Sequence, residues 1–220
     1  MRGEDVTSEQ IRTLYRQTTT VLLANCAIAA VLGEALWSST SRALVAGWLG
    51  AMAAVTAVRM LLARRYRSAS PSARDARAWG MRFVLGSVAS GSLWGATGFL
   101  FVTDARPLSQ LLVVFFVGGM CAAAAGTLAA YLPAFVGFIL PALAALALRA
   151  ALFGDALHQL TSAMLVFYGA GLFAAAKVNQ RALAEAFVLR FENAELVTSL
   201  SRTQRTLEQT NRALEHQVTE

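Results

Sequence analysis

Two adjoining stretches, LTSAMLVFYGAGLFAAA (residues 160–176) and KVNQRALAEAFVLRFENAELVTSL (residues 177–200), decide how the chain is organised. The first is apolar and close to the roughly 20 residues that cross a bilayer as a helix. The second starts with a lysine, carries charges throughout and repeats leucine at helical spacing. Together they predict a last membrane span that leads directly into a charged helix.

Leucines in the C-terminal part of the chain follow a seven-residue repeat. Two series lie four residues out of phase and define the a and d positions of a heptad: Leu189, Leu196, Leu200, Leu207 and Leu214. Asn193 falls at an a position, where a buried polar side chain favours one register at some cost in stability. We expect residues 177–220 to form a parallel coiled coil that joins two copies of the chain. The alternative is a lone amphipathic helix on the membrane or against its own domain.

The whole chain has the composition of a membrane protein. Hydrophobic residues make up 56% of its 220 residues and charged residues only 15%, and its mean hydropathy is +0.52. A soluble domain has about 25% charged residues. The net charge of +6 comes from basic residues that cluster between apolar runs and not on a soluble face rich in aromatic residues, which argues against nucleic acid as a partner.

Six apolar runs are about long enough to cross a bilayer as helices. They cover residues 18–37, 43–63, 79–102, 108–132, 133–153 and 160–176. The first run has the length of a full span and five more follow it, so we expect it to be retained and not cleaved as a signal peptide. The expected fold is all-α: a polytopic bundle of six transmembrane helices (residues 18–176), a preceding N-terminal segment (1–17) and a following coiled-coil signalling helix (177–220).

Arginine and lysine fall mainly on one side of the expected membrane. Residues 64–77 hold five arginines, further basic residues flank the first and last spans, and only Arg42 and Arg106 lie in the opposite loops. Because short basic loops stay in the cytoplasm, we expect a multi-pass plasma-membrane protein with both termini cytoplasmic. The opposite loops are too short to fold into a ligand-binding domain, so a stimulus would have to act within the membrane.

Stripes of small residues at four-residue spacing mark two of the spans. The third span carries Ser87, Gly91 and Gly95, and the fourth carries a similar set: Gly118, Ala122 and Gly126. Such stripes let helix backbones approach closely. We expect close helix packing at both, with a glycine hinge that transmits a signal as the alternative.

Four ionisable residues lie inside the expected spans, where such groups are functional candidates by default. All of them fall near span ends: Glu34, Arg59, Arg82 and Arg149. We expect Arg59 and Arg82 to extend their charges to the cytoplasmic interface. Two arrangements of Glu34 and Arg149 stay open, either a polar pair within the outer half of the bundle or two separate interfacial side chains.

Catalytic and ligand-binding motifs are missing from the sequence. Cys26 and Cys121 lie in apolar runs, where a thiol behaves as a small hydrophobe, and with the two histidines they form no metal-ligand cluster. Neither a GxSxG elbow nor a glycine-rich phosphate loop is present. His158 falls in an outer loop, and His216 lacks the acidic neighbour of a phosphoacceptor histidine. We predict no catalytic residue, cofactor or metal in this chain.

Three segments together resemble a known group of proteins: RAWGMRFVLGSVASGSLWG (77–95), VGGMCAAAAGTLAAYLPAF (117–135) and RFENAELVTSLSRTQRTLEQTNRALEHQVTE (190–220). They are similar to the N-terminal membrane input region of bacterial sensor histidine kinases. Related regions precede diguanylate cyclase and phosphodiesterase domains. The resemblance implies a location in the bacterial inner membrane. It also implies a full-length protein that is a histidine kinase, whose output domain would follow Glu220.

The expected function is therefore a membrane-embedded sensory module of a two-component signal-transduction protein. It would pass an intramembrane stimulus to a C-terminal output domain through a dimeric coiled coil. Its expected partners are membrane lipids, a second copy of the chain and a lipophilic ligand. The alternatives are the input module of a cyclic-di-GMP enzyme, a small transporter or channel, and an intramembrane enzyme. A transporter is disfavoured because the spans lack a central acidic or histidine relay, and an enzyme because acid and base groups are missing.

Overall fold

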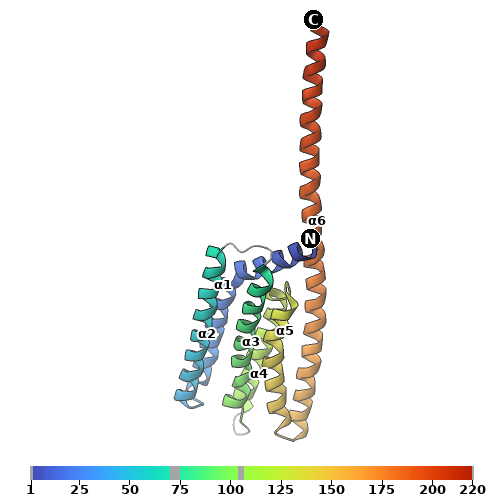
Figure 1. The fold of residues 1–220 in the computed structure, drawn as a ribbon. Coiled ribbons are helices and arrows are strands. Elements are labelled where there is room, and N and C mark those ends of the chain that lie inside the picture. The colour runs from blue at the N-terminus through green and yellow to red at the C-terminus, as the bar shows by residue number, and fades with distance from the viewer. Residues whose placement is uncertain (1, 70–74, 104–106, 220) are drawn as a thin grey trace. The chain divides into compact units, whose positions relative to one another are not determined.

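The structure, a computed structural model, describes residues 2–69, 75–103 and 107–219, and these ranges contain helices but no strand. The helices are α1 (Arg2–Trp37), α2 (Arg42–Ala69), α3 (Ala76–Phe101), α4 (Pro107–Thr127), α5 (Leu132–Ala151) and α6 (Ala156–Thr219) (Figure 1). Each contains a segment long and apolar enough to cross a membrane, so the prediction of six apolar helices is confirmed. The chain has the architecture of a multi-pass membrane protein.

The chain divides into two compact units, Met1–Arg181 and Ala182–Glu220. The first, called the bundle below, holds α1 to α5 and the start of α6. The second, the C-terminal segment, holds the remainder of α6. The predicted boundary between residues 176 and 177 lies close to this division.

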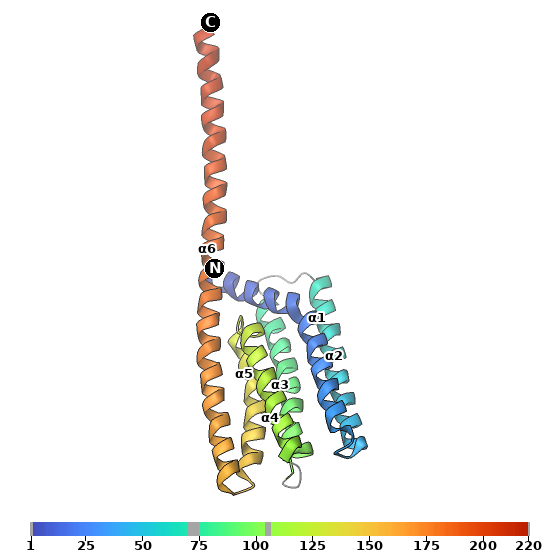
Figure 2. The ribbon, with the colours of Figure 1, turned by 180° about the vertical axis from the view of Figure 1, so that it is seen from behind.

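The bundle has two ends. At the near end lie the last residues of α2 and α4 and the first residues of α3 and α5; at the far end lie the last residues of α1, α3 and α5 and the first residues of α2, α4 and α6 (Figure 1). Figures 1 and 2 show the first part of α1 running across the near end before the helix turns along the bundle. Ile11, Leu14 and Tyr15 are buried there. Their helical spacing puts them on one face, so the N-terminal segment (1–17) is amphipathic in this part.

An aromatic cluster fixes this part of α1 to α2 and α3. The ring of Tyr15 stacks on that of Tyr66, with the centroids 3.9 Å apart, and meets Trp79 and Phe83 edge to face. The hydroxyl of Tyr15 donates a hydrogen bond of 3.1 Å to the carbonyl of Trp79. Offset and edge-to-face aromatic pairs add about 0.5–1.5 kcal/mol each beyond the area that they bury. The cluster therefore joins three helices at one end of the bundle.

Helices α3 and α5 form the most extensive interface of the bundle. A Cβ atom at Gly91 would lie 2.1 Å from the carbonyl oxygen of Phe138, and one at Gly95 would lie 2.5 Å from that of Pro141. Both distances are far below van der Waals contact, so the two backbones touch. The prediction of close packing is confirmed for the small residues of the third span.

The same prediction is wrong for α4. A Cβ atom at Gly126 would meet nothing within 4 Å, and one at Gly118 would lie no closer than 3.9 Å to the ring of Tyr168. Small residues that are spaced to admit a neighbouring helix can equally leave a space unfilled. On α4 they leave such a space, and the neighbouring helix does not fill it.

Helix α6 packs more loosely than the others. Only 11% of its most apolar window is buried, against 44% for α3 and for α5. In the described part of the chain, close backbone approaches join the first five helices to one another but not α6 to any of them. Within the bundle, α6 is instead held by side chains that donate hydrogen bonds to backbone carbonyls: Ser162 to Ala147 (3.0 Å), Tyr168 to Gly118 (2.7 Å) and Asn179 to Ala125 (3.4 Å).

The backbone contact of α3 with α5 can be tested by adding one methyl group. We expect Gly91→Ala to lower the free energy of unfolding by about 1–3 kcal/mol, the usual cost of overpacking, because the methyl group would meet backbone that cannot move aside. The measurement is unfolding of the purified protein by SDS in detergent micelles, followed by circular dichroism.

The matched control is Gly50→Ala on α2, where a Cβ atom would meet nothing within 4 Å. This substitution should leave stability unchanged or raise it by up to about 1 kcal/mol, since alanine favours the helix over glycine. Equal effects of the two substitutions would contradict the close contact.

Candidate functional site

A cavity of about 620 Å³ lies between α4, α5 and α6 towards the far end of the bundle. Its walls are mostly apolar side chains of α4 and α6, with a floor from α5: Leu111, Val114, Phe115, Gly118, Gly119, Leu146, Ala150, Leu157, Met164, Leu165 and Tyr168. The volume lies within the range of about 300–1,000 Å³ that is typical of small-molecule sites. The cavity exists because Gly118 and Gly119 of α4 have no side chains to fill the space next to α6, and α6 does not pack closely against them.

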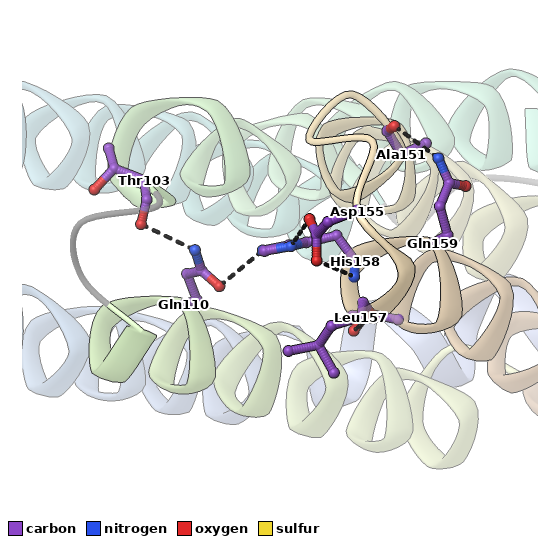
Figure 3. A network of polar contacts seen from close by, with 8 residues as sticks. Thr103, Gln110, Ala151, Asp155, Leu157, His158 and Gln159 are labelled. Carbon is purple, nitrogen blue, oxygen red and sulfur yellow. Dashed lines mark hydrogen bonds and ion pairs between the residues drawn. The ribbon is translucent and has the colours of Figure 1, made fainter.

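Polar groups gather at one end of this cavity, where Gln110 and His158 both line it. The amide nitrogen of Gln110 donates 2.9 Å to the carbonyl of Thr103, and its Oε1 lies 3.1 Å from Nε2 of His158. The Nδ1 atom of the same imidazole lies within hydrogen-bond distance of the carboxylate of Asp155. Figure 3 shows this chain of contacts crossing from α4 to the start of α6. It fixes the imidazole and the amide at the cavity wall.

Asp155 also caps α6. Its carboxylate accepts a hydrogen bond of 3.4 Å from the backbone N–H of His158, which is the N3 position of the helix. Partial desolvation acts to raise the pKa of Asp155. The hydrogen bonds from the side chain and backbone of His158, and the attraction of its ring, outweigh that effect and lower the pKa below its ordinary value.

His158 is therefore not a residue of an outer loop, as predicted, but part of the first turn of α6. The sequence does contain a signal for this helix start. An aspartate three residues before His158, ahead of an apolar run, is typical of an N-cap. Hydropathy alone missed it because Gln159 and His158 interrupt the apolar run.

The cavity favours a neutral and largely apolar molecule. Its lining includes no Asp, Glu, Lys or Arg, and the imidazole of His158 already contacts a carboxylate. A hydroxyl or carbonyl group of a ligand could reach Gln110 and His158 while a chain lies along Phe115 and Met164. A second apolar cavity of about 330 Å³ lies between α5 and α6, so α6 has unfilled space on more than one face.

Glu34 and Arg149 are not brought together. Arg149 donates 3.0 Å to the carbonyl of Val102 at the end of α3, and its guanidinium lies 4.1 Å above the ring of Phe153. Glu34 is exposed on α1. Among the described residues no ion pair joins Glu34 to Arg149. A free helix-end carbonyl is the nearer partner for Arg149.

Arg82 and Arg59 differ in their surroundings. Arg82 is exposed near the start of α3 and lies 4.6 Å above the ring of Trp79, and its position at a membrane interface stays a prediction. Arg59 is only 9% exposed, and its Nη1 donates 2.9 Å to the hydroxyl of Ser90. Its side chain is buried within the bundle, contrary to the expectation that it extends to the cytoplasmic interface.

The burial of Arg59 has a local cause on α3. A Cβ atom at Gly86 would lie 3.1 Å from Cγ of Arg59, so the absence of a side chain there makes room for the arginine stem. Ser90, one turn further along, supplies an acceptor, and the guanidinium lies 5.2 Å from the centroid of the Phe83 ring. These residues keep the charge inside the bundle.

A neutral polar cluster lies beside this arginine. The indole N–H of Trp94 donates 2.7 Å to Oδ1 of Asn25, whose amide nitrogen lies 3.4 Å from the sulfur of Met52. The thiol of Cys26 lies 3.3 Å from the hydroxyl of Thr56. A search restricted to ionisable residues missed this cluster. Counting Asn25, a strongly polar residue inside an apolar span, would have found it.

The seam residues of the C-terminal segment are exposed as far as they are described: Leu189 (58%), Leu196 (59%) and Leu200 (66%). The side chains of Leu207 and Leu214 lie outside the described residues. The coiled coil therefore stays a prediction.

As for metals, the described residues contain no group of three His, Cys, Asp or Glu side chains able to hold an ion.

Comparison of the chain with protein-family models, with curated proteins and with solved structures found no match.

The cap at the start of α6 predicts a pH dependence of stability. Because the pKa of Asp155 is lowered in the folded protein, its carboxylate stabilises the fold above the ordinary aspartate pKa of about 3.9. That contribution is lost as the pH falls through the lowered value. Asp155→Asn keeps an N-cap side chain but removes the charge.

We expect the melting temperature of the variant to be lower than that of the wild-type protein at about pH 5 to 7, where the carboxylate is charged. The two melting temperatures should converge as the pH falls below about 4. Thermal unfolding in detergent at a series of pH values measures this. A difference that stays constant down to the lowest pH would contradict the role of the charge.

Proposed function

We propose that the chain is the membrane-embedded sensory module of a signal-transduction protein. One observation carries this proposal: the helix that forms a wall of the 620 Å³ cavity is the same helix, α6, that bears the leucine repeat. A molecule that enters the cavity contacts the element from which the output helix is built. A site elsewhere in the bundle would act on that helix only through other helices.

The attachment of α6 suits such a role. A helix that is densely packed on all sides is held in one position, because a close-packed protein interior resists deformation. Helix α6 is instead linked to the rest of the bundle by single hydrogen bonds at Ser162, Tyr168 and Asn179 and by the contact of His158 with Gln110. A ligand that fits one arrangement of α6 better than another shifts the population towards it by its difference in affinity. Shifts of a helix by an ångström or two are a common form of this response.

The exposed leucines support a dimeric output. Leu189, Leu196 and Leu200 would remain in water on an isolated helix, and burial of a leucine side chain is worth about 1.5–3 kcal/mol. Two copies in one membrane place their α6 helices parallel, which is the orientation that the a and d seam requires. A second copy of the chain is therefore the proposed partner.

The resemblance to input regions of sensor histidine kinases supports a kinase as the output domain. Its relatives make an enzyme of cyclic-di-GMP metabolism the alternative. The arginines of residues 64–77 support an orientation with both termini in the cytoplasm of a bacterium. In that orientation the cavity opens in the outer half of the inner membrane, where a lipophilic molecule arriving from outside would meet it.

Disulfide crosslinking tests the dimer. In a background of Cys26→Ala and Cys121→Ala, we expect Leu196→Cys and Leu200→Cys to form crosslinked dimers in oxidised membranes, because facing seam positions bring Cβ atoms close enough for a disulfide. The yield of dimer on a non-reducing gel is the measurement.

Val188→Cys is the matched control, since Val188 is an exposed apolar residue of the same helix that falls outside the a and d positions. Its yield should be several-fold lower than that of the seam positions. Equal yields at all three sites would show that the crosslinks arise from random collision of single helices, and would contradict the coiled coil.

Filling the cavity tests the sensory site. A Cβ atom at Gly119 would meet nothing within 4 Å, so Gly119→Leu should be tolerated and place its side chain in the cavity. The probe is a hexadecanol that carries a diazirine and an alkyne, with labelling mapped to peptides of α4 and α6. We expect wild-type labelling there, with a large loss in the variant.

Gly47→Leu is the control, because a Cβ atom at Gly47 also meets nothing within 4 Å but the residue lies on α2, away from the cavity. It should label as the wild type does. Hexadecanol should also alter the crosslinking yields at Leu196→Cys and Leu200→Cys, and this change should be absent with Gly119→Leu. If hexadecanol labels the cavity but leaves the crosslinking yields unchanged, the cavity is a binding site without a role in signalling.

A further inference from the structure

A different cavity, of about 270 Å³, has the buried arginine in its wall. It lies among α1, α3, α4 and α5, with Arg59 reaching it from α2. Its polar lining consists of Arg59, Ser90, Asn25 and two threonines, and the remainder is apolar, including Leu22, Ile28 and Phe138. It shares no lining residue with the cavity beside α6.

The charge of Arg59 has no anionic partner among the described residues. The ion pairs found there join Arg12 to Glu9 and His158 to Asp155. The hydrogen bond to Ser90 uses one of the five N–H donors of the guanidinium, and the Phe83 ring covers one face. A buried cation in a membrane is costly unless an anion neutralises it, and such a residue marks a functional site by default.

The cavity opens sideways between α1 and α4. Three of its lining residues are exposed although they belong to the cavity wall: Thr20 and Ala24 of α1, and Ala123 of α4. These helices are candidate membrane spans, so the opening faces the bilayer and not water. A molecule that enters here comes from the membrane and carries an apolar chain.

We propose that this cavity binds the carboxylate of a single-chain anionic amphiphile such as a long-chain fatty acid. The carboxylate lies against the guanidinium of Arg59, with the side-chain amide N–H of Asn25 as a further donor, and the chain leaves between α1 and α4. One negative charge balances the one positive charge. The volume of about 270 Å³ lies just below the range of about 300–1,000 Å³ that is typical of small-molecule sites, so the cavity suits a small headgroup and the first carbons of its chain. This inference is independent of the proposed function.

Photoaffinity labelling tests it. The protein is placed in phosphatidylcholine nanodiscs with a hexadecanoic acid that carries a diazirine and an alkyne, and labelled peptides are mapped. We expect labelling of α1 and α4 that hexadecanoate displaces and hexadecanol does not. Because a hydrogen bond to a charged group is stronger than one between neutral groups, Arg59→Gln should reduce this labelling about tenfold or more. Arg59→Lys should retain the preference for the acid over the alcohol.

Matched substitutions control for charge and for shape. Arg82→Gln removes an exposed arginine of α3 and should leave labelling unchanged. Ala123→Phe fills the opening without changing any charge and should abolish labelling, whereas Ala122→Phe alters the neighbouring exposed residue, which does not line the cavity, and should not. The alanine variants also keep the test valid if Arg59→Gln fails to fold, which thermal unfolding would show.

Three results would overturn the proposal. Hexadecanol could compete as well as hexadecanoate, or a folded Arg59→Gln protein could label as the wild type does; either would remove the role of the charge. Phosphatidylglycerol added to the nanodiscs could displace the probe as hexadecanoate does, which would assign the site to a two-chain anionic lipid.

Discussion

The direct contact between the backbones of α3 and α5 is the constraint around which the bundle is arranged. Gly91 and Gly95 have no side chain to hold the helices apart, and carbonyl groups of α5 occupy the space that a Cβ atom would need. Without a hydrophobic driving force between helices in lipid, such contacts supply much of the association. The remaining helices surround this pair, and α6 lies beyond the reach of comparable packing.

Most of the architecture could be predicted from the sequence, and the reason is that hydropathy is a property of single segments. Each of the six apolar runs corresponds to a helix, although α1 begins at Arg2, well before the run of residues 18–37, and α6 continues to Thr219. The features that could not be predicted depend on which helix lies next to a given residue. The small residues of α3 and α4 have the same spacing, yet Gly91 meets a backbone and Gly126 meets nothing within 4 Å. Only the position of the neighbouring helix separates these two outcomes.

The charged residues show the same limit. Arg59 was expected at the membrane surface because of its place along α2, but its environment is set by Gly86 and Ser90 on another helix. His158 was assigned to a loop because it interrupts an apolar run, although Asp155 marks the start of a helix. Polar residues in a membrane protein are thus predicted less well than apolar ones, since their cost depends on whether a partner is within reach.

The links between α6 and the bundle have one further consequence. Ser162, Tyr168 and Asn179 all donate to carbonyls of neighbouring helices, and a carbonyl oxygen has a second lone pair free after its own helical hydrogen bond. The next carbonyl on the same face of a helix lies one turn away, about 5.4 Å along the axis. Sliding α6 by one turn would break the contact of His158 with Gln110 but would offer each of these three donors another carbonyl, whereas intermediate positions would leave them without acceptors in apolar surroundings. Movement of α6 along the bundle is therefore expected to be stepwise and not continuous.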